Sequence, residues 1–163
     1  EIAQCLVGSE MCIRDSYNKV VGANSRLDEM QAGLLRVRLQ HMKEITDERV
    51  RLCERYQKLL DNPLLQLPKV REGATTVWHQ FVIHCSRRDE LIAYLNQKEI
   101  GTIIHYPIPP HLSEAYQYLG LKERALPITE QYAKEVVSIP LYNGMTEEEQ
   151  DYVITCLNAF GKE

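Results

Sequence analysis

Residues 75–85, TTVWHQFVIHC, decide the fold class, because β-branched and aromatic side chains follow one another there as they do in strands. Beyond them, apolar residues recur at helical spacing and predict a helix over 87–97. A second strand is predicted at 102–106, where Pro107 stops it. A strand, a helix and another strand in this order indicate a layered α/β arrangement.

The carboxy-terminal residues continue the same alternation. Helices are predicted over 112–119 and 128–135, and a third strand over 136–140. Thr146 and Glu149 have the spacing of a capping box, which opens the last helix. We expect the inner side of that helix to carry Tyr152, Val153, Leu157 and Phe160.

The amino-terminal side of the chain predicts one long helix, or two collinear ones, over 26–60. Ser25 is the expected N-cap and Asp28 the acidic first-turn residue. A helix of that length extends about 50 Å, more than one small core covers. It is therefore expected to connect two bodies or to pack on a partner chain, and a short edge strand is expected at 64–67. Its two apolar rows are Leu27, Met30, Leu34 and Val37, and Leu35, Leu39 and Met42.

These elements predict an α/β fold of the α+β layered type, with a small sheet of three to four strands. Residues 17–62 form the lead-in and the long bridging helix, and 63–163 form a small carboxy-terminal domain. Residues 1–16 are expected to be foreign, because LVGSEMCIRDS at 6–16 matches a translated transposase-type sequencing adapter. The natural protein would then begin near Tyr17, as part of a longer parent.

Composition excludes several classes of function. The formal net charge of −4, without a basic run, argues against binding to nucleic acid or to an anionic membrane. No apolar stretch approaches the roughly 20 residues of a membrane span, and no signal peptide is recognisable. The five scattered cysteines indicate reduced thiols, so a cytoplasmic protein is expected.

Two segments carry candidate binding chemistry. His105 and Tyr106 end a predicted strand, and the prolines before His111 stiffen the loop that follows. Buried structural rings are the alternative interpretation of this segment. Residues 22–28, GANSRLD, place an amide and the Arg26 guanidinium ahead of a helix, where an anion can bind. Plain helix capping is the alternative there.

A zinc site is a third possibility, since histidine and cysteine are zinc ligands. The spacing argues against it, because His79 and His84 are five apart on a predicted strand and face opposite sides. The remaining candidates are Cys85, His105 and His111.

Four ordered motifs together resemble the DegT-type sugar aminotransferases. They are GANSRLDEMQA at 22–32, VWHQF at 77–81, the run from Gly101 to His111, and SIPLY at 138–142 followed by MTEEE at 145–149. The resemblance covers the chain from about Tyr17 to its end. It implies the carboxy-terminal part of an aspartate-aminotransferase-like fold, known as fold type I.

The resemblance also implies chemistry. These enzymes use pyridoxal 5'-phosphate to move an amino group from glutamate to a nucleotide-linked keto sugar, and the form HYPIPPH at 105–111 is similar to members acting on dTDP-3-keto-6-deoxyhexoses. In the family, the lysine that holds the cofactor as a Schiff base lies upstream of the Asn motif, and Lys19 lacks the surrounding pattern. This chain is therefore expected to contain no catalytic lysine and to be inactive alone.

The motifs assign roles by position. Asn24 matches a residue that reaches the cofactor phosphate of the neighbouring subunit, and Arg26 is a further charge partner. His105, Tyr106 and His111 match the substrate-facing segment. A homodimer with a shared active site follows from this assignment. The alternatives are a non-catalytic binding or dimerisation module and, less favoured, a histidine metal protein.

Overall fold

The computed structural model describes residues 27–162, which belong to two compact units. Within the described residues, one unit takes in 27–40 and the segment His105–Lys134. The other takes in His41–Ile104 and the residues from Glu135 onward. The second unit is thus discontinuous in sequence, and it contains the sheet and the hydrophobic core.

The sheet of the second unit is an antiparallel pair, β1 (Phe81–His84) and β2 (Val136–Ile139). Phe81 pairs with Ile139, and His84 pairs with Val136. Two isolated bridges extend this pair, Gln66 to His84 and Ile103 to Ser138. All four segments predicted to be extended therefore take part in β pairing, but only two of them are strands.

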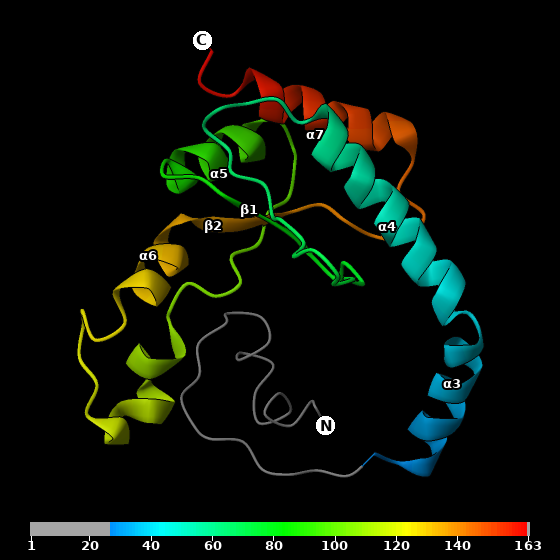
Figure 1. Ribbon diagram of the computed structural model, residues 1–163, viewed down its shortest axis with the longest axis horizontal. Coiled ribbons are helices and arrows are strands. Elements are labelled where there is room, and N and C mark those ends of the chain that lie inside the picture. Colours follow the sequence, from blue (N-terminus) through cyan, green and yellow to red (C-terminus); the bar gives the residue numbers. More distant parts are fainter. Residues whose placement is uncertain (1–26, 163) are drawn as a thin grey trace. The chain divides into compact units, whose positions relative to one another are not determined.

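Three helices of the second unit surround this pair: α4 (Met42–Leu59), α5 (Arg88–Gln97) and α7 (Glu147–Ala159). Figure 1 shows α5 and α7 on one side of the two strands. Gln150 of α7 donates to the Leu52 carbonyl of α4 at 2.7 Å, so these two helices pack directly. The largest side chains fully buried in this core are Tyr56, Phe81, Leu52, Ile83, Leu91, Leu95 and Leu157.

The first unit contains α3 (Glu29–Gln40), the 3-10 turns η1 (Pro110–Leu112) and η2 (Glu114–Leu119), and most of α6 (Pro127–Glu135). No residue of α3 is buried. Its apolar side chains are exposed, Met30 by 80% and Leu34 by 73%. None of the helices within residues 27–162 is both long and apolar enough to cross a membrane.

The helix predicted over 26–60 is two helices, because His41 leaves the helical region with a ψ of 6° between them. The expected N-cap Ser25 lies outside the described residues. Asp28 occupies the position before α3, and its carboxylate accepts from the Met30 N–H at 2.7 Å. The capping box of α7 is confirmed, with Thr146 and Glu149 each accepting from the other's backbone N–H.

Three predicted elements differ from the structure. The strand predicted over 75–85 is only four residues long, because Trp78 has a φ of 48°, which extended strands do not adopt. The strand predicted at 102–106 is reduced to the single bridge at Ile103. The helix predicted over 112–119 is a pair of 3-10 turns, separated by Ser113 in an extended conformation. Tyr152 is half-exposed rather than on the inner side of α7, and its hydroxyl donates to the Lys98 carbonyl.

Candidate substrate-binding segment

The segment predicted to face a substrate, 105–111, lies in the first unit between the bridge at Ile103 and η1. The His105 and Tyr106 rings stand perpendicular, with their centroids 5.8 Å apart, and the peptide bond between them is cis. Tyr106 is 57% exposed. More than half of this residue is therefore open to solvent, and its substrate-binding role stays a prediction.

His111 has a different environment from the other two rings. It is only 7% exposed, and its Nε2 lies 3.1 Å from the Glu130 Oε1 atom. Its Nδ1 is buried without a hydrogen-bond partner within the described part of the chain. The substrate-binding role assigned to His111 stays a prediction, and the geometry places this ring against Glu130 of α6.

Glu130 is the acceptor that links three parts of the first unit. Besides its contact with His111, its carboxylate accepts from the Arg124 N–H at 2.9 Å and from the Leu126 N–H at 3.2 Å. The Arg124 N–H, followed by the contacts with His111 and Leu126, lowers the pKa of the Glu130 carboxyl below its ordinary value, against the opposing effect of desolvation. The carboxylate is therefore held in its charged form.

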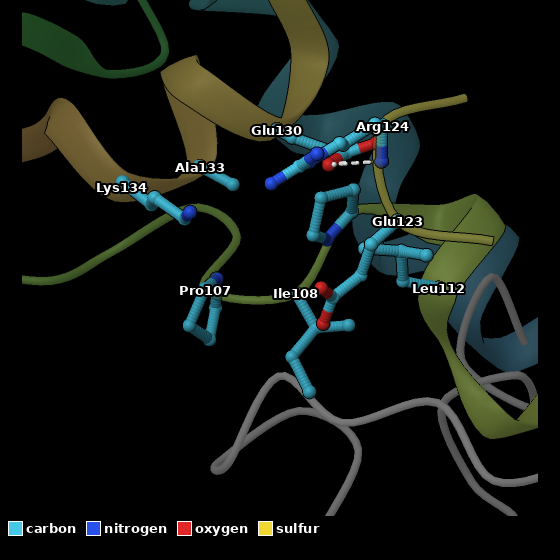
Figure 2. Close-up of a pocket in the computed structure, with 9 residues that line it drawn as sticks. Pro107, Ile108, Leu112, Glu123, Arg124, Glu130, Ala133 and Lys134 are labelled. Atoms are coloured by element: carbon cyan, nitrogen blue, oxygen red, sulfur yellow. Dashed lines mark hydrogen bonds between the residues drawn. The ribbon is translucent and has the colours of Figure 1, made fainter. Parts of the chain in front are cut away.

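A pocket of about 460 Å³ adjoins this carboxylate. Apolar residues from the 105–111 segment and from α6 line it together with four charged side chains. The lining residues are Pro107, Ile108, Pro109, Leu112, Glu123, Arg124, Glu130, Ala133 and Lys134. Figure 2 shows the Arg124 and Glu130 side chains together at one side of this pocket, with Pro107 and Ile108 opposite them.

Sequence reasoning missed the charged residues of this pocket. Arg124 has a φ of 71°, in the left-handed region that non-glycine residues rarely adopt, and the hydrogen bond from its N–H to Glu130 holds it there. Neither residue belongs to a motif that the sequence singled out. The one available signal was an acidic residue, Glu130, in the first turn of a predicted helix.

The other predicted candidates do not belong to this segment. Asn24 and Arg26 lie outside the described residues. His84 of the second unit contacts the Glu135 carboxylate, with Nε2 and Oε2 2.5 Å apart, and His79 is exposed. Across residues 27–162, no group of three or more histidine, cysteine, aspartate or glutamate side chains is placed to hold a metal ion.

The motif at 77–81 and the run 138–149 meet in a polar cluster of the second unit. The Arg49 guanidinium of α4 donates to the Trp78 and His79 carbonyls at 3.2 and 3.0 Å and to the Asn143 amide oxygen at 2.8 Å. Glu48 accepts from Asn143 and from the Gly144 N–H. Because these polar groups satisfy one another, the cluster holds the two motifs on α4 and leaves no evident ligand site.

The residues described do not fit a covalent site for pyridoxal phosphate. Such a site needs a lysine amine in a desolvated pocket, which lowers its pKa. Every lysine in the described part of the chain is exposed, and the Asp47 carboxylate raises the pKa of Lys43. The described residues therefore offer no anchor for the cofactor, and no covalent step follows from them.

Comparison with known proteins identifies close relatives. The chain is 42% identical over 143 residues to the erythromycin biosynthesis sensory transduction protein EryC1 of Saccharopolyspora erythraea, covering 87% of this chain and 39% of that protein. It is 38% identical over 144 residues to the dTDP-3-amino-3,6-dideoxy-alpha-D-galactopyranose transaminase of Aneurinibacillus thermoaerophilus, covering 88% and 39%. The chain thus spans about two fifths of the length of these curated relatives.

A solved structure supports the same relationship. The S. venezuelae protein DesV, crystallised in complex with a ketimine intermediate, matches with a TM-score of 0.81 and 34% identity over 99% of this chain and 43% of its own. The expected fold class, the carboxy-terminal part of an aminotransferase fold, is thereby confirmed. The model of one family matches residues 3–158. The chain belongs to the DegT/DnrJ/EryC1/StrS aminotransferase family.

Proposed function

We propose that this chain is the carboxy-terminal part of a pyridoxal-phosphate-dependent aminotransferase that moves an amino group from glutamate to a nucleotide-linked keto-deoxysugar. The observation that carries the proposal is the match to DesV, 34% identical across 99% of this chain. The transaminase of A. thermoaerophilus supports the substrate class, because its name specifies a dTDP-linked amino sugar. Family membership favours an enzyme over a non-catalytic dimerisation module.

Within this proposal the chain supplies binding groups rather than the covalent anchor. When bound to the complete enzyme, pyridoxal phosphate supplies the electron sink for amino transfer. Asn24 and Arg26 would hold the cofactor phosphate of the partner subunit in a homodimer, because an amide and a guanidinium can both donate to an anion. His105 and Tyr106 contact the sugar, and the 57% exposure of Tyr106 supports this role. His111, at the end of the same segment, is the third residue assigned to substrate binding.

A chimeric enzyme tests the proposal directly. Residues 17–163 replace the matching carboxy-terminal part of the A. thermoaerophilus transaminase, and dTDP-3-keto-6-deoxyhexose with glutamate serves as the substrate pair. We expect amino-sugar product by mass spectrometry. Tyr106→Phe and His105→Ala should each lower the rate about tenfold or more, because each removes a polar contact to the sugar.

The matched control is His79→Ala, which removes an exposed histidine of the second unit and should leave the rate unchanged. A chimera that folds, dimerises and binds the cofactor, yet forms no product, would contradict the proposed function. Equal losses in His79→Ala and His105→Ala would contradict the assigned role of the segment.

A further inference from the structure

The Glu130 carboxylate occupies a position that the proposed chemistry does not use. It is the common acceptor of three hydrogen-bonding groups of the same unit: the His111 ring, the Arg124 N–H and the Leu126 N–H. The Glu130 side chain is 13% exposed and that of His111 is 5% exposed. Removing this carboxylate would leave three polar groups without their acceptor. Two of them are backbone N–H groups, of Arg124 and Leu126, which precede α6.

The partners of Glu130 belong to segments far apart in sequence. His111 ends the 105–111 segment, whereas Arg124 and Leu126 lie in the turn that leads into α6. Arg124 has a left-handed φ of 71°, which is costly for a residue with a side chain. A charge-assisted hydrogen bond to its N–H offsets that cost. One carboxylate therefore fixes the turn and the segment against the same helix.

The 105–111 segment is stiff, so a restraint on His111 at one end also limits the motion of His105 and Tyr106 at the other. Three prolines, Pro107, Pro109 and Pro110, fix φ along it. η1 adds the Leu112 N–H bond to the Pro109 carbonyl at 2.9 Å. Because Pro109 and His111 are buried, the inner end of the segment has little freedom once Glu130 holds the histidine ring. The orientation of His105 and Tyr106 then depends on an anchor that touches neither.

We propose that Glu130, acting through His111, is a positioning residue that sets the His105–Tyr106 pair for binding of the nucleotide-linked sugar. The effect on sugar binding rests on the proposed function. The hold of Glu130 on the 105–111 segment belongs to the 163-residue chain itself, so it can be measured without an activity assay.

Hydrogen exchange of the whole chain tests the restraint. Glu130→Gln removes the charge and one acceptor, so exchange in 105–112 and in 122–126 should accelerate about tenfold. His111→Phe removes only the link to the segment, so exchange should accelerate in 105–112 and not in 122–126. Exchange in β1 and β2 should stay at the wild-type rate in both variants, which shows that the core remains folded.

Glu135→Gln is the matched control, because it breaks the other histidine–glutamate pair at the end of the same helix, with His84. It should leave exchange in 105–112 unchanged. Wild-type exchange in 105–112 for both Glu130→Gln and His111→Phe would overturn the inference. Acceleration by Glu135→Gln equal to that by Glu130→Gln would overturn it as well.

The chimeric enzyme separates positioning from general stability. Glu130→Gln should raise KM for the nucleotide-linked sugar about tenfold, with kcat, KM for glutamate and cofactor absorbance near their wild-type values. An unchanged KM for the sugar despite faster exchange in 105–112 would overturn the positioning role. An inactive wild-type chimera would count against the proposed function instead, and the exchange rates would still decide whether Glu130 holds the segment.

Discussion

At the scale of single residues, Gln150 is the most unusual member of the core. Its side chain is fully buried, and its Nε2 donates to the Leu52 carbonyl at 2.7 Å. Its Oε1 has no hydrogen-bond partner within the described residues. A buried acceptor without a donor costs free energy, and an apolar side chain of similar volume avoids that cost.

Gln150→Leu should therefore keep the free energy of unfolding within about 1 kcal/mol of wild type, because relief of the unpaired oxygen offsets the lost bond to α4. Gln150→Ala should lower it by about 2 kcal/mol or more, because it leaves a cavity. Urea denaturation of the three proteins measures both changes. A larger loss for leucine than for alanine would contradict this account.

The lysines carry a second prediction at this scale. All of them are exposed in the described part of the chain, so their amines remain hydrated and react with an aldehyde much alike. Mixing the chain with pyridoxal phosphate and reducing with borohydride should label several lysines weakly and none completely. Peptide mass spectrometry reads the labelling, and one lysine modified at full occupancy would show that an anchor is present after all.

At the scale of elements, α4 is joined to the turn before α7 by charged and polar contacts. The Asn143 amide and the Gly144 N–H both donate to Glu48, and they lower the pKa of its carboxyl below its ordinary value. A depressed pKa in the folded state means that this contribution to stability is present above the unfolded pKa of about 4.3. It is lost as the pH falls through the folded value.

Glu48→Gln should accordingly lower the unfolding midpoint at neutral pH, and its difference from wild type should shrink below pH of about 4. Thermal unfolding across this pH range measures the difference. Glu54→Gln changes an exposed carboxyl on the same helix and provides the control. A difference that stays constant down to pH of about 2 would show that the charge of Glu48 is not what matters.

Elements with strong local signals were predictable, and those that depend on distant contacts were not. The capping box at Thr146 and the proline start of α6 are encoded within four residues, so both helices were found. The left-handed conformation of Trp78 could not be predicted from local sequence, because its carbonyl accepts from Arg49, 29 residues earlier in the chain. The same limit applies to the candidate site: His105 and Tyr106 follow from a motif, whereas the contact of Glu130 with His111 needs the fold.

At the scale of the whole molecule, the exposed apolar face of α3 is the main liability. Met30 and Leu34, and Leu27 just before the helix, are all more than half exposed, and no residue of this helix is buried. Exposed apolar surface of this kind promotes association. The chain alone is therefore expected to form oligomers or aggregates in solution.

Light scattering checks this expectation. Met30→Glu combined with Leu34→Glu should shift the chain towards smaller species, because charge opposes burial of the helix face. Gln31→Glu adds a charge on the same helix without removing an apolar side chain, and it should leave the distribution unchanged. A wild-type chain that is monomeric at the same concentration would contradict the prediction.

The discontinuity of the second unit has an evolutionary consequence. Ile103 and Ser138 are hydrogen-bonded neighbours, so the chain leaves this unit and returns to it at almost the same place. Residues 105–134 are thus an insertion between adjoining anchor points, the kind of excursion that proteins tolerate best. Selection can lengthen, shorten or exchange that excursion while the second unit keeps its own packing.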